Sequence, residues 1–387
     1  MNIAIFTDTF LPNINGIVTL VIDSAKGLAE RGHKVLIIAP RAKKGYSVDM
    51  GKNISVRFIS SVKAYFYEGF RFTFPSTLKL IRLLKEFKAD VIHLHTQFTL
   101  GVEALVCAKI MHKPLVGTFN TFIAEPGYLK HMKLDKIKPV QKIAWIYSNF
   151  FYNRCNIVIS PSKATKSVLK KEGVKKKIKV IPYALDLSKF RRFSRREIES
   201  AKKNYGINDK TVLFVGRISH EKSVDTLIEA MKLVAKDVPD SKLLIIGGGP
   251  LLSRLKKQYS AKNIRFTGMI KNSKLVDSAI IPSCSVFATM SKTDNQPLAI
   301  LEAMAFGLPV IGVDRLGVPE MVDKNGFIAP ADNCKVFASY MIKLLEDKNL
   351  RKAYGQRSME LVKRFSLDKV TEDMEKAYLS AIRDYSK

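Results

Sequence analysis

Residues 289–312 read Thr-Met-Ser-Lys-Thr-Asp-Asn-Gln-Pro-Leu-Ala-Ile-Leu-Glu-Ala-Met-Ala-Phe-Gly-Leu-Pro-Val-Ile-Gly. The stretch carries one carboxylate at Asp294, a second at Glu302 and, between them, a helix that we expect to start at Pro297. Proline suits the first position of a helix, and the N-terminus of a helix can bind an anion. Two carboxylates beside an anion site indicate a phosphate flanked by hydroxyl-rich groups, as in a nucleotide sugar. The alternative is a capped surface helix with an incidental glutamate.

Short apolar runs recur on both sides of this stretch, and helical patterns separate most of them. Strands are expected at residues 3–6, 35–38, 56–59, 91–94, 115–117, 157–159, 212–215, 242–246, 264–267, 286–288 and 310–313. Helices are expected at residues 18–31, 75–87, 224–236, 250–259, 297–306, 336–346 and 368–385. The alternation is typical of an α/β protein with parallel sheets covered by helices on both faces.

The alternation stops and restarts once, around an expected linker at residues 180–190. We therefore expect two doubly wound, Rossmann-like domains facing a cleft, at residues 1–183 and 184–367, with a final helix, 368–387, that crosses back to the first domain. A chain of 387 residues is long enough for two such domains. Sheets of this kind bind ligands at the carboxyl ends of their strands.

The amino-acid composition limits the cellular compartment in which the protein is expected and the kinds of site that it can contain. The chain is 47% hydrophobic, and its four cysteines are widely spaced without a Cys-x-x-Cys pair: Cys107, Cys155, Cys284 and Cys334. This spacing argues against a disulfide framework and a zinc site, and it fits a reducing compartment. No signal peptide and no apolar run of about 18 residues is recognised. We expect a cytoplasmic protein, peripheral on the cytosolic face of a membrane.

The net charge of +30 is concentrated in the first half of the chain. Residues 1–200 carry 35 Lys and Arg against 14 Asp and Glu, and the remainder carries 30 against 21. A strong positive field attracts nucleic acid, anionic lipid or an anionic substrate. Solubility or a general lysine bias is the alternative. No recognition helix, zinc finger or RNA-binding motif supports specific nucleic-acid binding. The sequence gives no signal for an oligomeric state.

The segment 214–223, Phe-Val-Gly-Arg-Ile-Ser-His-Glu-Lys-Ser, follows an expected strand. Gly216 lets the backbone turn close to a ligand, and Arg217 and Lys222 lie five residues apart on one loop. A guanidinium grips phosphate through two hydrogen bonds, whereas an ammonium supplies a mobile point charge. The alternative is a charged surface turn. A glycine-rich turn that includes Gly248 follows the next strand.

Three features of the first half also point to ligands. Asn15-Gly16 forms a tight turn into a helix, where backbone amides can reach an anion. His93 and His95 alternate on a strand and point to one face, either as a hydrogen-bonded pair or as two metal ligands without an evident third. Asn120, in Thr-Phe-Asn-Thr, can donate and accept hydrogen bonds to a hydroxyl but cannot carry a proton near neutral pH.

Taken in order, these motifs resemble the retaining glycosyltransferases of family 4, over nearly the whole chain. The resemblance implies the GT-B fold, with the first domain on the acceptor side and the second binding the nucleotide sugar. Asp294 would hold the donor sugar and Glu302 the ribose, while Gly216, Arg217 and Lys222 hold the pyrophosphate. Gly248 would lie near the base and ribose, and Gly16 near the donor phosphate and acceptor. The remaining donor contacts implied are Asn295, Gln296 and Leu298.

The chain departs from the family pattern at three positions. Asp294 stands where a glutamate is usual, Pro297 where a glycine is usual, and Asn120 where many members have a histidine near the donor hexose. The resemblance still implies retaining transfer, in which the donor phosphate takes the acceptor proton and no metal or other cofactor takes part. Asp294, Asn120, Arg217 and Lys222 are then the expected catalytic residues.

Residues 128–154 mix six cations with six aromatic rings, including the only tryptophan. Such a mixture is typical of an element lying in a membrane interface, although an ordinary amphipathic helix packed on its own domain is the alternative. The expected membrane and acceptor contacts are Lys130, Lys133, Lys136, Lys138, Lys142 and Trp145. Gly-Ile-Val-Thr, His-x-His-Thr and Thr-Asp-Asn-Gln stretches resemble the diacylglycerol glucosyltransferase branch of the family.

We therefore expect transfer of a hexose from a nucleotide sugar to a membrane lipid such as diacylglycerol or a phospholipid. The residues do not separate a UDP- from a GDP-linked donor, and UDP is taken as the working expectation. The alternatives are the same fold acting on a polysaccharide or soluble acceptor, a nucleotide-sugar epimerase, and a basic nucleic-acid-binding protein.

Overall fold

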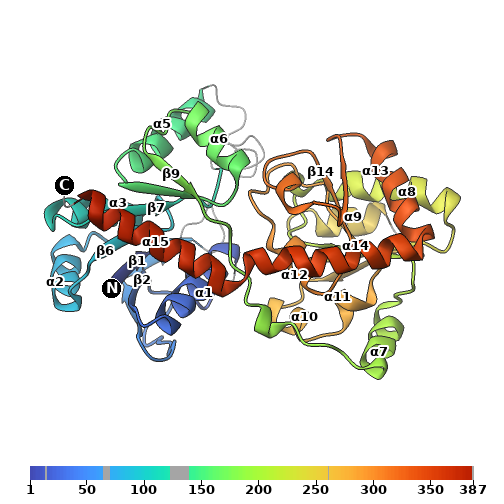
Figure 1. Cartoon of the computed structure of the whole chain (residues 1–387), viewed down its shortest axis with the longest axis horizontal. Helices are drawn as coiled ribbons and strands as arrows, with labels where there is room; N and C mark the ends of the chain where they lie inside the picture. The colour runs from blue at the N-terminus through green and yellow to red at the C-terminus, as the bar shows by residue number, and fades with distance from the viewer. Residues whose placement is uncertain (14, 64–69, 123–138, 260, 386–387) are drawn as a thin grey trace. The chain divides into compact units, whose positions relative to one another are not determined.

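The computed structural model describes the whole chain except residues 14, 64–69, 123–138, 260 and 386–387. The chain forms two compact units (Figure 1). The first unit combines residues 1–184 with residues 367–387, and the second comprises residues 185–366. The last helix, α15 (Leu367–Tyr385), therefore belongs to the same unit as the N-terminus.

A seven-stranded parallel sheet forms the centre of the first unit. Its spatial order is β3 (Ile54–Ile59), β2 (Lys34–Pro40), β1 (Asn2–Phe6), β6 (Val91–Leu94), β7 (Leu115–Thr118), β8 (Ile157–Ser160) and β9 (Lys177–Val180). The central strands are apolar at almost every position because helices cover both faces, as is usual for parallel sheets.

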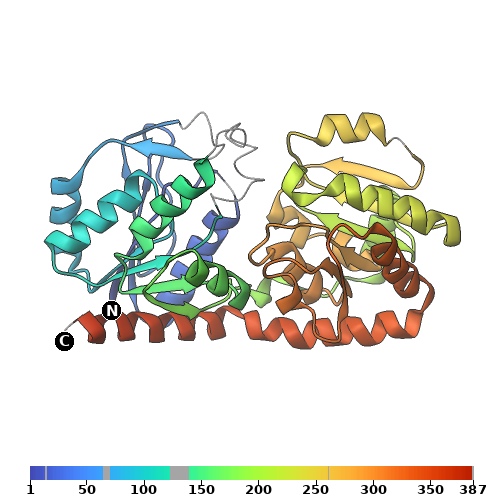
Figure 2. The same ribbon diagram turned by 90° about the horizontal axis from the view of Figure 1, so that it is seen from above.

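One face of this sheet packs against α1 (Gly16–Glu30) and α15, whose apolar side chains share one buried cluster with the strands. The helices α2 (Thr77–Phe87), α3 (Thr99–Ile110) and α5 (Val140–Tyr152) lie on the other side of the sheet (Figure 2). A small antiparallel pair, β4 (Ser61–Lys63) and β5 (Arg71–Thr73), stands apart from the main sheet. The helix α6 (Lys163–Lys171) joins β8 to β9.

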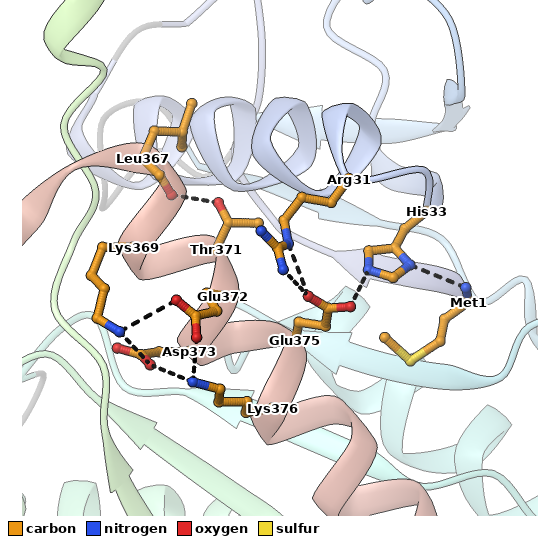
Figure 3. A network of polar contacts seen from close by, with 10 residues as sticks. All are labelled: Met1, Arg31, His33, Leu367, Lys369, Thr371, Glu372, Asp373, Glu375 and Lys376. Carbon is orange, nitrogen blue, oxygen red and sulfur yellow. Dashed lines mark hydrogen bonds and ion pairs between the residues drawn. The ribbon is translucent and has the colours of Figure 1, made fainter.

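Polar contacts fasten α15 to the N-terminal part of the first unit (Figure 3). The Glu375 carboxylate lies 2.7 Å from Nη2 of Arg31 and 3.2 Å from Nε2 of His33. Nδ1 of His33 in turn lies 3.1 Å from the Met1 amine. Both partners of Glu375, Arg31 and His33, lie in the turn after α1, and His33 also contacts the N-terminus, so the two ends of the polypeptide are joined in one unit.

The second unit is built around a six-stranded parallel sheet. Its order is β12 (Ile264–Gly268), β11 (Lys242–Ile246), β10 (Thr211–Val215), β13 (Val286–Ala288), β14 (Val310–Val313) and β15 (Gly326–Ala329). One face carries α8 (Val224–Asp237), α9 (Leu252–Gln258) and α13 (Cys334–Glu346). The other carries α11 (Ile280–Ser283), α12 (Leu298–Ala305) and α14 (Lys348–Leu361). The helices α7 (Arg195–Tyr205) and α10 (Asn272–Val276) complete this unit.

Both sheets reverse their strand order once. In the first sheet the reversal lies between β1 and β6, and in the second between β10 and β13. The connections on either side of a reversal leave the sheet in opposite directions, so a crevice opens at the carboxyl ends of the two strands. In folds of this kind, ligands usually bind in that crevice. A ligand site is therefore expected on the loops that follow these four strands.

The doubly wound α/β prediction is confirmed, and the eleven expected strands are all present, with ends that coincide or differ by at most two residues. The sequence analysis missed β4, β5, β9 and β15. The first three are short or lysine-containing edge segments, and β15 is only four residues long and starts with glycine. The helix expected to start at Pro297 starts one residue later, because Pro297 has an extended backbone and precedes the first turn.

Candidate functional site

The predicted cations and the first predicted acid of the second unit lie on the two loops at its strand reversal. Arg217 and Lys222 follow β10, and Asp294 follows β13. Nζ of Lys222 forms an ion pair with Oδ1 of Asp294. The two side chains are 20% and 17% exposed, so solvent screens the pair only in part. The structure thus brings together two residues that are 72 positions apart in the sequence.

Further hydrogen bonds hold these two loops in register. The backbone carbonyl of Glu221 accepts from the backbone N–H of Lys292 at 3.3 Å and from the hydroxyl of Ser291 at 3.5 Å. The Glu221 carboxylate accepts from the Ser219 hydroxyl. The cation-bearing loop and the acid-bearing loop are therefore braced by backbone contacts as well as by the ion pair. Sequence analysis gave Glu221 no role, since bracing through its carbonyl depends on the partner loop.

The glycine-rich turn after β11 packs backbone to backbone against the Arg217 loop. The N–H of Ile218 donates to the carbonyl of Gly248 at 2.8 Å. A Cβ on Gly247 would lie 1.8 Å from the carbonyl oxygen of Gly216, and one on Gly249 would lie 2.4 Å from that of Ile218. These contacts explain why glycine is needed on both sides of Gly248. The contact of Gly248 with a ligand stays a prediction.

The second predicted acid, Glu302, lies in a different environment from Asp294. It points inward from α12 and is only 5% exposed. Its carboxylate accepts a 2.7 Å hydrogen bond from Nδ2 of Asn272, at the start of α10. Burial raises the pKa of Glu302 to about 7, and the hydrogen bond from Asn272 opposes that rise. The charge of Glu302 therefore depends on pH near neutrality.

Asn272 is a site residue that sequence analysis missed. It lies 30 positions before Glu302, on a five-residue helix without a recognisable motif. No spacing rule connects the two positions, because the contact depends on how α10 packs beside α12. Asn295 and Gln296 are buried in the loop that leads into α12, and Leu298 is its first, half-buried residue. Contacts of these three residues with a donor stay predictions.

In the first unit, Gly16 is the first residue of α1 and follows β1 across one loop. Asn15 caps the helix, since its Oδ1 accepts from the N–H of Val18 at 3.0 Å, while its Nδ2 donates to the Thr9 hydroxyl at 2.9 Å. Among the described residues, no atom lies within 4 Å of a Cβ built on Gly16. The described residues therefore leave space beside Gly16 at the helix N-terminus, and a role for Gly16 stays a prediction.

Asn120 lies just past β7, at the same edge of the first sheet. Its Nδ2 donates to the backbone carbonyl of His95 at 2.8 Å. The hydroxyl of Tyr183 donates to the backbone carbonyl of Asn120 at 3.5 Å. The side-chain amide is thereby fixed in orientation next to the end of β6. Since Asn120 and Asp294 belong to separate units, their roles in one reaction stay predictions.

His93 and His95 lie against each other in the core, with ring centroids 4.2 Å apart. His93 bonds through Nδ1 to the Tyr378 hydroxyl at 2.8 Å and through Nε2 to the Thr118 hydroxyl at 2.7 Å. Burial, and then the neighbouring His95, lower the pKa of His93 well below its ordinary value, so it is neutral. The ring nitrogens of His95 have no hydrogen-bond partner among the described residues. The described part of the chain contains no cluster of three His, Cys, Asp or Glu suited to a metal.

The basic, aromatic stretch is only partly described. Lys130, Lys133, Lys136 and Lys138 lie outside the described residues. Lys142 is exposed on α5, whereas Trp145 is half-buried and stacks on Phe119 with centroids 6.3 Å apart. Trp145 therefore helps to pack α5 on its own sheet, and the membrane role given to it and to Lys142 stays a prediction. No helix among the described residues is long and apolar enough to span a membrane.

Two doubly wound units with parallel sheets are the architecture of the GT-B class of glycosyltransferases. A solved structure titled "Crystal structure of Anabaena Alr3699/HepE in complex with UDP" agrees with this fold with a TM-score of 0.76 at 19% identity, covering 98% of this chain and 100% of the other. Residues 14–189 match the family described as Glycosyltransferase Family 4, and residues 195–360 match Glycosyl transferases group 1.

Two curated relatives share the name alpha-monoglucosyldiacylglycerol synthase. The protein from Acholeplasma laidlawii is 30% identical over 325 residues, covering 80% of each chain. The protein from Streptococcus pneumoniae is 28% identical over 319 residues, covering 80% of this chain and 70% of its own. The chain belongs to glycosyltransferase family 4, and the resemblance drawn from its motifs is confirmed. It is a glycosyltransferase.

Proposed function

We propose that this glycosyltransferase moves a hexose from a UDP-linked donor to a hydroxyl of a membrane lipid, diacylglycerol or a phospholipid, with retention at the anomeric carbon. The observation that carries the proposal is the meeting of Lys222 with Asp294 at the strand reversal of the second sheet. A cation for a leaving phosphate and a carboxylate for a sugar hydroxyl are needed side by side, and here they are preassembled.

Donor binding follows from the chemistry of the loops. Arg217 and Lys222 would take the diphosphate, since a guanidinium and an ammonium on one loop match its charge. Asp294 would exchange the ammonium of Lys222 for a hexose hydroxyl, and Glu302 would accept from the ribose hydroxyls. Lys222 would thus exchange one anionic partner for another, whereas Asp294 would exchange an ionic partner for a hydrogen-bond donor.

Catalysis would rest on charge stabilisation at the leaving group. As the bond from the anomeric carbon to the phosphate oxygen breaks, negative charge grows on the diphosphate, and Arg217 and Lys222 would stabilise it. Preorganised electrostatics of this kind is often the largest catalytic contribution. A phosphate oxygen would accept the proton of the attacking hydroxyl on the same face, which yields retention without a metal, a cofactor or a covalent intermediate. Asn120 would hydrogen-bond the hexose.

Three observations support a lipid acceptor and a UDP donor. The two synthases that match this chain carry diacylglycerol in their names. The similar solved structure is described with UDP. The positive charge concentrated in the first half of the chain favours an anionic membrane surface. We therefore place the protein at the cytosolic face of a membrane, held peripherally.

The test is sugar transfer from a panel of UDP- and GDP-sugars, with diacylglycerol in anionic vesicles, with a soluble sugar acceptor, or without acceptor. The matched variant is Asp294→Ala with Glu302→Ala. We expect lipid-dependent release of UDP that the variant lacks, and a product with the donor's anomeric configuration. Transfer only to the soluble acceptor would replace the lipid by a saccharide acceptor. Altered donor without any acceptor would indicate an epimerase.

A further inference from the structure

An exposed apolar ridge crosses two neighbouring helices of the first unit. On α3, Val102, Val106 and Ile110 recur every four residues, and on α5, Ile143, Ile146 and Phe150 recur at intervals of three and four. Their exposed fractions lie between 37% and 60%. Both helices already bury another face against the sheet, so these side chains are additional to those that hold the fold together.

The two stripes belong to one surface. Figure 2 shows α3 and α5 side by side on the same side of the sheet. A Cβ on Gly101 of α3 would lie 3.4 Å from the ring of Phe151 of α5. The hydroxyl of Tyr147 on α5 donates to the backbone carbonyl of Gln97, two residues before α3. The two apolar stripes therefore belong to a pair of helices in direct contact, and we refer to them together as the apolar ridge.

Cations outnumber acids on the helices of the ridge and on the neighbouring helix α2. On α2, which packs beside α3, and on α3 and α5 themselves, the exposed charged side chains are one acid, Glu86, and five cations: Lys79, Arg82, Lys85, Lys109 and Lys142. Arg154, just after α5, lies with its guanidinium 3.7 Å from the centre of the Phe150 ring. The other acid of these helices, Glu103, is buried and accepts hydrogen bonds from Ser76 and Thr77.

We propose that the apolar ridge on α3 and α5, with its cationic border, is the face by which the protein docks on an anionic lipid bilayer. Apolar side chains on one face of an interfacial helix enter the boundary between headgroups and acyl chains, and cations beside them meet anionic headgroups. This docking face would bring the first unit to its lipid acceptor, so its purpose rests on the proposed function.

The charge pattern favours a bilayer over the other occupants. A second copy of the chain meeting the same face would bring cations against cations with little acid to compensate them. Nucleic acid would use the cations but would leave the apolar side chains without partners. An anionic membrane surface satisfies both components at once, the ridge by insertion and the border by attraction.

The test is co-sedimentation of the full chain with vesicles of phosphatidylcholine alone and of phosphatidylcholine with phosphatidylglycerol, without donor or acceptor. Two double variants probe the ridge: Val106→Gln with Ile110→Gln on α3, and Ile143→Gln with Ile146→Gln on α5. A matched control replaces two apolar residues that are similarly exposed elsewhere, Met359→Gln with Leu379→Gln. Thermal melting checks that each variant is folded.

We expect the wild type and the control to bind anionic vesicles and to bind neutral vesicles weakly. Each ridge variant should bind less, and the four substitutions together should lower partitioning by about tenfold. Unchanged binding of the folded fourfold variant would overturn the proposal. Sedimentation equilibrium gives a second check. If the wild type is a dimer and the fourfold variant is a monomer that still binds vesicles, the proposal is also overturned, and the ridge is assigned to contact with a second copy of the chain.

The outcome is separable from that of the sugar-transfer assay. Vesicle binding through the ridge, with no turnover on any acceptor, would leave the docking face standing and reject the proposed function. If the fourfold variant binds vesicles as the wild type does and still transfers sugar to lipid, the proposed function stands and the docking face is rejected.

Discussion

The ammonium of Lys222 is paired with the carboxylate of Asp294 across the strand reversal of the second sheet. The pair joins the loop after β10 to the loop after β13, and both side chains are mostly withdrawn from solvent. Removal of either partner would leave the other charge unpaired and partly withdrawn from water. The stability lost in this way is larger than the stability that a solvent-exposed ion pair contributes. The pair is thus both a brace between the two loops and, in the proposed reaction, the source of a cation for the leaving group.

A first prediction concerns this pair. Lys222→Ala should lower kcat/KM for the donor by about a hundredfold or more, because it removes preorganised positive charge from the leaving diphosphate. Steady-state kinetics with a range of donor concentrations gives the value. Lys292→Ala is the matched control, since Lys292 is on the same loop as Asp294 but pairs with the more exposed Asp332. Equal losses in the two variants would show that the effect is general surface charge.

The second prediction follows from the pKa of Glu302, which is raised to about 7 in the folded chain. Because the folded state holds this proton more tightly than the unfolded state, the stabilising contribution is present below the ordinary pKa, near 4.5, and is lost as the pH rises through 7. Glu302→Gln imitates the protonated form. It should therefore raise the free energy of unfolding at pH 8, by up to about 3 kcal/mol, and change it little near pH 5.

Urea unfolding of the wild type and of Glu302→Gln at both pH values measures the difference. Glu221→Gln is a suitable control, because Glu221 is an acid on a neighbouring loop with a half-buried side chain. A stabilisation that is the same at pH 5 and pH 8 would mean that burial of the charge is not its cause. Under the proposed function, Glu302→Gln should also weaken UDP binding, so the site would gain stability and lose affinity in one substitution.

The third prediction assigns Asn272 as a positioning residue for Glu302. Asn272→Ala removes a hydrogen bond to a carboxylate, and bonds of this kind are worth about 1.5–3 kcal/mol. The donor KM should therefore rise about tenfold or more, while kcat falls much less, because the contact would serve binding of the ribose. Asn204→Ala, on the exposed face of α7, is the control. Titration of UDP affinity against pH gives an independent readout, since loss of the hydrogen bond should move the midpoint of the Glu302 titration upward.

Much of the fold could be predicted from the sequence because its signals are local. Strands such as β6 and β13 are short apolar runs that must be buried on both faces, and their ends were placed correctly. The edge strand β9, Lys-Ile-Lys-Val, was missed because half of its side chains are lysines that remain near solvent. Pro297 ends an extended segment instead of opening the helix, a distinction of one residue that local preference does not resolve.

The candidate site was predictable only where both partners belong to a motif. Arg217, Lys222 and Asp294 stood out by their spacing, and the structure adds that the last two touch. Asn272 could not be found in this way, since its contact with Glu302 is created by the packing of two helices. The same holds for the apolar ridge, because the helix pattern of α3 does not reveal which of its apolar residues the sheet leaves uncovered.

The last prediction concerns the attachment of α15 to the first sheet. The hydroxyl of Tyr378 lies 2.8 Å from Nδ1 of His93, and both residues are fully buried. Tyr378→Phe keeps the ring but leaves the polar nitrogen without this partner in the core, which should lower the free energy of unfolding by about 1–3 kcal/mol. Tyr385→Phe, at the exposed end of the same helix, should change it by less than about 0.5 kcal/mol. Urea unfolding followed by circular dichroism measures both, and an equal effect of the two substitutions would show that the buried hydrogen bond does not hold α15 in place.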